Sequence, residues 1–310
     1  MKRFLLAMLF GLALALGGTV AWLAWRDPLS ALPGAEGPVE VMPGPAQREA
    51  GRLLQHYVLR SPGLGPIGLT VSLPDPLPEQ PLPVLVVLGG ANTGRKNLRQ
   101  VPAASTYVLI GYDWPLPRKL PKGLALARAM PGLYPQVLAV PGQVAAAVGW
   151  LAGQPWADAE RISLLGFSLG ALMAPAAQRV ARSSGHDIGW TVLAYGGADL
   201  GTILAAHPKA DLGWSRPWVG AAANLLLRPI EPAEHLPHLA GRFLLIGASE
   251  DQLVPRPSFE LFRELTPEPK TVVLLDGGHI GTRARQGALL GEIVGLTRGW
   301  LIDQGAVTSP

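Results

Sequence analysis

Short, wholly apolar runs recur along the chain from residue 84 onward and alternate with segments of helical spacing. The first run, Val84 to Leu88 (VLVVL), has no polar residue on either face, which is typical of a parallel strand covered on both sides. Five later runs continue the series, at residues 106–111, 161–165, 190–195, 242–246 and 270–275. Helical patterns lie among and after them, at residues 136–151, 169–182 and 286–300. This alternation predicts an α/β domain in which a mostly parallel sheet carries helices on both faces.

Two earlier segments, 52–59 and 67–73, are predicted to add a hairpin at the sheet edge, so we place the domain over residues 51–310. The preceding residues 27–50 are rich in proline and glycine, show no periodicity and are predicted to form a linker. Apolar residues make up 48% of the 310 residues and charged residues 15%, which excludes a disordered chain. The net charge of +4 is spread without a dense basic cluster, and this argues against nucleic-acid binding. The chain has no cysteine, which excludes disulfides, thiolate catalysis and cysteine-based metal sites.

The first 26 residues carry a separate signal. Two basic residues precede an uncharged stretch, Phe4 to Trp25, which as a helix is about long enough to cross the roughly 30 Å hydrocarbon core of a bilayer. Trp22 and Trp25 at its far end are typical of interfacial anchors. We therefore predict an N-terminal transmembrane helix that anchors the domain outside the cytoplasm, on the periplasmic or extracellular face. A cleaved signal peptide, which would leave the domain secreted, is the alternative.

A serine lies between two glycines directly after one of the apolar runs. The sequence GFSLG, from Gly166 to Gly170, follows the predicted strand 161–165 and opens the predicted helix 169–182. A sharp turn between strand and helix needs little side-chain bulk at its flanks, which the glycines provide. Such a turn would expose the hydroxyl of Ser168 and direct the N–H of Leu169 toward a developing oxyanion. We therefore predict that Ser168 is a nucleophile.

A second oxyanion donor is expected from the loop after the strand 84–88. Two glycines begin this loop and let the backbone come close to a ligand. The N–H of Gly90 is the favoured donor and that of Ala91 the alternative, and the side-chain amide of Asn92 is a candidate substrate contact. A plain glycine turn remains the other interpretation of this loop.

A serine hydroxyl needs a base, and histidine is the usual one near neutral pH. Of the six histidines, only His279 comes just past a predicted strand, in the segment VVLLDGGHIG. The base in turn needs a carboxylate that fixes its tautomer. Asp251 follows the predicted strand 242–246 and is the favoured acid, with Glu250 as the alternative.

The order Ser168, Asp251, His279, together with the GFSLG turn and the Gly-Gly loop, resembles the α/β-hydrolase superfamily. The segments IGASEDQLVP and DGGHIG are similar to its acid and histidine loops, and the resemblance runs from about residue 52 to the C-terminus. It is nearest to dienelactone-hydrolase-like and prolyl-oligopeptidase-like enzymes. One departure is that many relatives have histidine before the oxyanion glycines, where this chain has Leu88. The resemblance implies acyl transfer to Ser168 and hydrolysis by water activated at His279, with no metal and no organic cofactor.

Residues 198–241 lie between two core strands and are predicted to form a small helical lid over the pocket. Trp214 and Trp218 within this insertion, and Trp114 after the strand 106–111, are candidate substrate contacts. Structural packing of the two insertion tryptophans is the alternative.

Three functions are compatible with these features. The favoured one is a membrane-anchored serine hydrolase, resembling carboxylesterases, that cuts a small carboxylic ester. A serine peptidase of the same fold is the nearest alternative, and a non-catalytic binding protein on the same scaffold is the other. The complete set of serine, acid and histidine favours an enzyme.

Overall fold

The computed structural model of the protein describes residues 17–35, 37–91, 98, 101, 104–117, 119, 121, 123–208, 212–280 and 286–309. Within these residues a single sheet runs through the molecule in the order β1-β2-β3-β5-β4-β6-β7-β8-β9. Its strands are β1 (Glu40–Glu49), β2 (Arg52–Ser61), β3 (Gly65–Pro74), β4 (Leu82–Leu88), β5 (Val108–Tyr112), β6 (Ala157–Phe167), β7 (Trp190–Ala194), β8 (Arg242–Ala248) and β9 (Lys270–Leu275).

The strands divide into an antiparallel and a parallel part. Strands β1 to β3 form an antiparallel meander, and β3 pairs antiparallel with β5. From β5 through β4, β6, β7, β8 and β9, every neighbouring pair is parallel. The carboxyl ends of β4, β6, β7, β8 and β9 therefore meet at one edge of the sheet, where ligand-binding loops of α/β proteins gather. The predicted α/β class with a mostly parallel sheet is confirmed.

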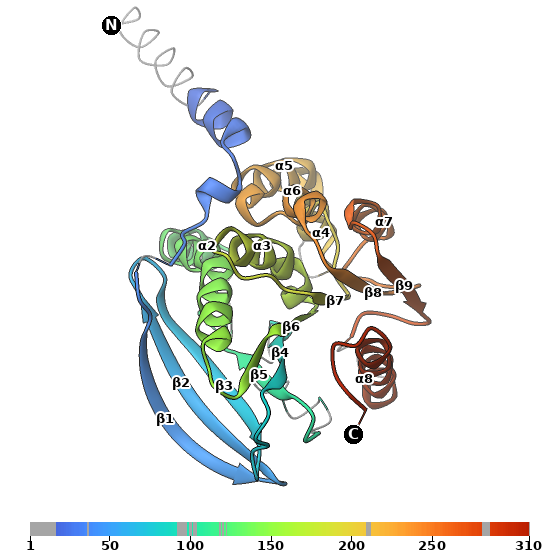
Figure 1. The fold of residues 1–310 in the computed structure, drawn as a ribbon. Coiled ribbons are helices and arrows are strands. Elements are labelled where there is room, and N and C mark those ends of the chain that lie inside the picture. Colours follow the sequence, from blue (N-terminus) through green and yellow to red (C-terminus); the bar gives the residue numbers. More distant parts are fainter. Residues whose placement is uncertain are drawn as a thin grey trace, which may run out of the picture.

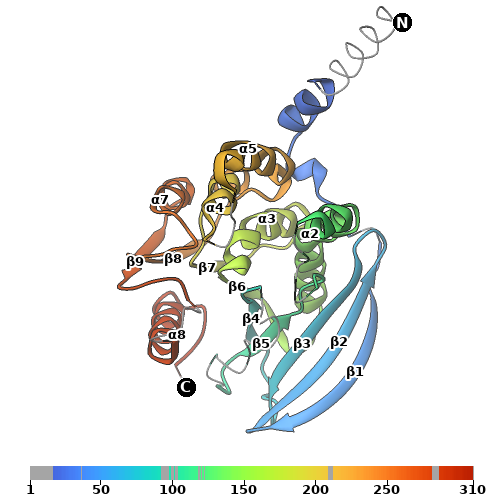
Figure 2. The same ribbon diagram turned by 180° about the vertical axis from the view of Figure 1, so that it is seen from behind.

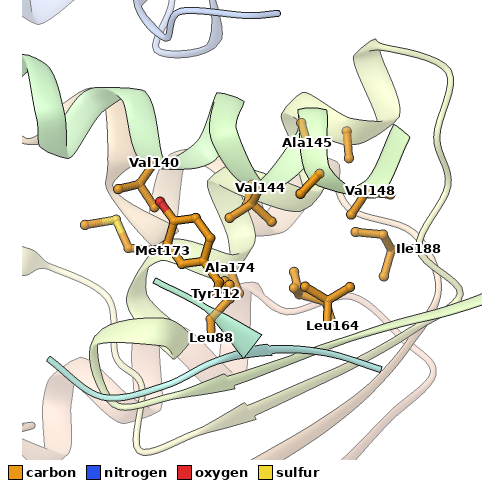
Figure 3. Packing of buried hydrophobic residues seen from close by; sticks show 14 of the residues in the cluster. Leu88, Tyr112, Val140, Val144, Ala145, Val148, Leu164, Met173, Ala174 and Ile188 are labelled. Atoms are coloured by element: carbon orange, nitrogen blue, oxygen red, sulfur yellow. The ribbon is translucent and has the colours of Figure 1, made fainter. Parts of the chain in front are cut away.

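Helices cover both faces of the parallel part (Figures 1 and 2). Outside the insertion between β7 and β8, the described α-helices are α2 (Leu124–Ala152), α3 (Leu169–Ser183), α7 (Arg256–Leu265) and α8 (Gln286–Asp303). Helices α2 and α3 lie on one face and α8 on the other, and the apolar residues of β4 alternate between the two. Val84, Val86 and Leu88 join the core beside α2 and α3, whereas Leu85 and Val87 join the core beside α8. Figure 3 shows the first core, in which Leu88, Leu164 and Tyr112 from the sheet face Val140 and Val144 of α2. Burial on both faces explains why these strands read as uninterrupted apolar runs.

The insertion between β7 and β8 is helical, as expected. It contains α4 (Leu200–Ala206), η3 (Gly213–Ser215), α5 (Arg216–Leu226), η4 (Arg228–Ile230), α6 (Pro232–His235) and η5 (Leu236–His238). These elements lie on the α3 side of the sheet, away from α8 (Figures 1 and 2). The role of the insertion as a lid stays a prediction.

Residues 40–49, which we placed in the linker, form strand β1 instead. The strand is an edge strand with nearly all its side chains exposed, so its sequence shows no alternation of apolar and polar residues. Its register with β2 shifts between Pro43 and Ala46, and such irregular edge positions accept proline and glycine. Earlier in the same segment, η1 (Leu29–Ala31) is followed by Leu32, which is buried in the core beside α2 and α3.

The prediction of an N-terminal transmembrane helix is wrong. In the described part of the chain, no helix combines the length and the apolar character needed to cross a membrane. The chain then turns at Asp27, whose carboxylate accepts the N–H groups of Leu29 and Ser30, and Arg228 donates to the carbonyl of Arg26 at 2.7 Å. The structure therefore does not support membrane association through this helix. The location of the domain outside the cytoplasm stays a prediction.

Candidate active site

Ser168 occupies the turn between β6 and α3. Its backbone has φ 53° and ψ −113°, a conformation that costs energy for any residue with a side chain and is typical of functional turns. The N–H of Ser168 donates to the carbonyl of Ala194 at 2.9 Å, which ties the turn to the end of β7. The sheet thus helps to hold the strained turn in place.

The two glycines of GFSLG are required by close backbone contacts. A Cβ atom on Gly166 would lie 2.7 Å from the carbonyl oxygen of Gly170, and one on Gly170 would lie 1.9 Å from that of Leu88. Neither contact leaves room for a side chain. The second contact also shows that the start of α3 lies directly against the carboxyl end of β4.

The structure brings Ser168, His279 and Asp251 together in one hydrogen-bonded row. Ser168 Oγ lies 2.8 Å from His279 Nε2, and His279 Nδ1 lies 2.8 Å from Asp251 Oδ2 and 3.0 Å from Oδ1. Since a carboxylate only accepts hydrogen bonds, Nδ1 carries the proton and Nε2 is left to accept from the serine hydroxyl. The histidine and aspartate side chains are 3% and 6% exposed, so bulk water hardly competes with these bonds.

Backbone contacts fix the acid loop. Asp251 Oδ1 also accepts the N–H groups of Leu253 and Val254, at 2.8 and 2.9 Å. Glu250, the alternative acid, is exposed, and its N–H donates to the carbonyl of Gly277 in the histidine loop. Of the two candidates, the structure therefore places Asp251 against His279 and joins the two loops through the backbone.

Tyr195 is a site residue that the sequence analysis missed. It follows β7 with φ 59°, and its ring meets the imidazole of His279 edge-on, with ring centroids 5.2 Å apart. Burial, with the negative charges of Asp251 and Glu292, raises the pKa of the Tyr195 phenol to about 12, so it is neutral near pH 7. The predicted strand 190–195 included Tyr195, whereas β7 ends at Ala194, so the rule that selected the other three residues, a position just past a strand, did not find it.

The loop after β4 lies where an oxyanion donor is expected. Because Leu88 contacts Gly170, the peptides of Gly89 and Gly90 begin beside the first turn of α3, where helix geometry leaves the N–H of Leu169 without a helical partner. Trp114 Nε1 donates to the carbonyl of Gly90 at 3.2 Å. Asn92 lies outside the described residues. The oxyanion roles of Leu169, Gly90 and Ala91 stay predictions.

The candidate substrate contacts differ in exposure. Trp114 is half-buried and stands edge-on to Tyr112, with centroids 5.3 Å apart. Trp214 and Trp218 are 86% and 72% exposed, so the alternative of structural packing does not describe them. Their contact with substrate stays a prediction. Among the described residues, no group of three or more side chains is arranged to hold a metal ion.

A mostly parallel sheet with helices on both faces, a serine at a strand–turn–helix junction, and an acid and a histidine after later strands define the α/β-hydrolase fold, and this chain has that fold. No protein-family model matches the sequence, and no curated protein sequence matches it significantly.

The fold of this chain is, however, similar to those of several solved structures. The chain is similar to an acetyl xylan esterase from Paenibacillus sp. R4, with a TM-score of 0.62 and 18% identity over 89% of this chain and 93% of that one. Acetyl xylan esterase 1 from Thermoanaerobacterium sp. gives a TM-score of 0.60 and 15% identity over 88% and 92%. An acylaminoacyl peptidase from Pyrococcus horikoshii gives 0.57 and 16%, over 82% of this chain and 42% of that one. At these identities the likeness concerns the fold.

Proposed function

We propose that this protein is a serine hydrolase that cleaves carboxylic esters of small molecules. The observation that carries the proposal is the hydrogen-bonded row from Ser168 through His279 to Asp251, at the edge of the sheet where the parallel strands end. A serine hydroxyl becomes a nucleophile when it is hydrogen-bonded to a base that is itself hydrogen-bonded to a carboxylate, and these three side chains have that arrangement.

In the proposed reaction, Ser168 Oγ attacks the ester carbonyl while His279 Nε2 takes the hydroxyl proton. Asp251 keeps Nδ1 protonated and stabilises the imidazolium that forms. The negative charge on the former carbonyl oxygen is stabilised by backbone amides of Leu169 and of the Gly90–Ala91 loop. His279 then donates its proton to the leaving alcohol, and water activated by the same imidazole hydrolyses the acyl-enzyme.

The similar structures favour an ester over a peptide bond. Two acetyl xylan esterases match over 92% and 93% of their own length, whereas the acylaminoacyl peptidase matches over 42% of its length. The esterases are thus the fuller precedent, and we propose short-chain acyl esters as the first substrates to try. Peptide cleavage is the second candidate, and the peptidase match is the observation that favours it.

A fluorophosphonate probe and p-nitrophenyl acetate test the proposal on the full chain. We expect the wild type to be labelled once and to hydrolyse the ester. Ser168→Ala should take no label and lose at least about 10⁴-fold in kcat, because the nucleophile is gone. Ser183→Ala, at the end of α3, is the matched control and should behave as wild type. Labelling of Ser168→Ala, or of neither protein, would contradict the proposal.

A further inference from the structure

Trp114 makes a polar contact with the loop that carries the proposed oxyanion amides. It follows β5, and its indole N–H donates to the carbonyl oxygen of Gly90, two residues past the end of β4. The contact joins positions 24 apart in the chain, and from the sequence alone Trp114 was predicted only to contact the substrate.

The indole is itself held by the buried core. Its ring meets that of Tyr112 at 88°, with centroids 5.3 Å apart. Tyr112 is fully buried, and its hydroxyl donates to Gln143 Oε1 of α2 at 2.5 Å. The amide of Gln143 in turn donates to the carbonyl of Leu64 at 2.6 Å. Figure 3 shows Tyr112 packed within this core beside Val140 and Val144. The position of Trp114 is therefore set by rigid elements, not by the loop that it contacts.

The planarity of the peptide bond gives this contact a consequence for catalysis. The carbonyl of Gly90 and the N–H of Ala91 belong to one planar trans unit and point in opposite directions. A hydrogen bond that fixes the carbonyl therefore also fixes the direction of the Ala91 N–H. The preceding residues of the loop are glycines, whose backbone adopts many conformations, so an outside contact has much to restrict here.

We propose that Trp114 is a positioning residue, which orients the Gly90–Ala91 peptide so that the Ala91 N–H donates to the oxyanion formed on Ser168. This inference rests on the proposed hydrolase function. It makes Ala91 rather than Gly90 the donor from this loop. The proposed role differs in its kinetics from that of a residue that lines the pocket. An oxyanion donor stabilises the transition state and so affects kcat, whereas a pocket-lining residue affects substrate binding and so KM.

Trp114→Phe tests the inference, because it removes the N–H donor and keeps an aromatic ring against Tyr112. Trp190→Phe is the matched control, since Trp190 Nε1 also donates to a backbone carbonyl, that of Gln304, at 3.1 Å. Trp190 begins β7 and so lies at the opposite end of that strand from the site. Both variants lose one indole hydrogen bond of the same kind, and only Trp114→Phe changes the proposed oxyanion loop.

With p-nitrophenyl acetate we expect kcat of Trp114→Phe to fall by about ten- to a hundred-fold with KM within about twofold of wild type. The inhibition constant of a trifluoromethyl ketone, which forms a tetrahedral adduct with a catalytic serine, should rise by the same factor as kcat/KM falls. Trp190→Phe should keep the wild-type values. Endpoint labelling of Trp114→Phe by fluorophosphonate should still be complete, which separates this test from that of the hydrolase itself.

Three results would overturn the inference while labelling of Ser168 stands. Trp114→Phe could keep the wild-type kcat. Its KM could rise with kcat unchanged, which would make Trp114 a residue that lines the pocket and binds substrate. Both tryptophan variants could lose activity in proportion to a lowered Tm, which would make its role structural.

Discussion

Two regions of this protein each bury a histidine and a carboxylate, and they use them differently. At the ends of β8 and β9, His279 and Asp251 bond to each other, and His279 also bonds to Ser168. In the insertion between β7 and β8, His235 and Glu231 bond separately to the backbone. His235 Nε2 lies 2.8 Å from the carbonyl oxygen of Pro229, and the carboxylate of Glu231 accepts three N–H groups, from Asp199, Leu200 and Ala233.

The difference lies in what the partners can do with a proton. A backbone carbonyl or amide holds a side chain in place and cannot exchange a proton with it near neutral pH. A serine hydroxyl and a carboxylate on the two nitrogens of one imidazole form a path along which a proton moves. Burial of titratable groups is therefore common to both regions, and only the side-chain partners distinguish them. We call His235 and Glu231, which bond only to the backbone in these contacts, the structural clamp of the insertion.

The largest difference in kcat is expected between substitutions of the two buried histidines, His279 and His235. His279→Ala should lower kcat for p-nitrophenyl acetate by about 10⁴-fold or more, since Ser168 loses its base. His235→Gln, the matched change at the other buried histidine, should leave kcat within about twofold of wild type. Circular dichroism should show both variants folded. Retained turnover in His279→Ala would move the base to another residue.

The next effect separates the two candidate acids. Asp251→Asn leaves an amide against Nδ1 and favours the wrong tautomer of His279, so kcat should fall by about 10³- to 10⁴-fold. Glu250→Gln changes the exposed neighbour in the same loop and should leave kcat unchanged. Steady-state kinetics of the pair decides the matter, and a larger loss in Glu250→Gln would overturn the assignment of Asp251.

The sequence predicted the parallel strands and the three polar residues for one physical reason. A strand buried on both faces must be wholly apolar, so its end is visible, and the residues just past it share one edge of the sheet. Ser168 and Asp251 follow strands buried in this way. His279 follows β9, whose apolar run was placed at its observed limits although half of the side chains of this edge strand are exposed.

Other features have no such local signal. Strand β1 is an exposed edge and shows no alternation, and α2 runs through Pro131, Pro135 and Pro141, where proline would suggest a helix start. The hydrogen bond from Trp114 to Gly90 depends on how β5 and β4 lie side by side. The burial of His235 likewise depends on tertiary packing, which a short polar segment such as EHLPH does not reveal.

The clamp in the insertion should show its effect in stability. Glu231→Ala removes the acceptor of three N–H groups at a buried position, and we expect a loss of about 3 kcal/mol, or roughly 6–12 °C in Tm for a domain of this size. Glu234→Ala, in the short helix α6 that directly follows Glu231, breaks a half-exposed ion pair with Arg228 and should cost less than about 1 kcal/mol. Thermal unfolding compares the two, and both should still be labelled at Ser168. Equal losses would mean that Glu231 is no clamp.

The smallest effect is a dependence of stability on pH that comes from His235. Burial, with the positive charges of Arg179 and His238 and against the opposing effects of the Pro229 carbonyl and Asp27, lowers the pKa of His235 to about 4. An unfolded histidine has a pKa near 6.5, so between about pH 6.5 and pH 4 the unfolded state binds a proton that the folded state does not. This contribution to stability is complete above pH 6.5 and is lost as the pH falls, by about 2 kcal/mol at pH 5.

His235→Gln keeps an N–H donor for the carbonyl of Pro229 and cannot titrate, so its free energy of unfolding should fall less than that of wild type between pH 7 and pH 5. His238→Gln changes the exposed histidine of the same segment and removes one of the smaller causes of the lowered pKa of His235, so it should keep most of the wild-type dependence. Urea unfolding at several pH values measures the three proteins. Parallel curves for His235→Gln and wild type would mean that His235 takes up its proton in the folded state as readily as in the unfolded one, and the contrast between the two buried histidines would then rest on geometry alone.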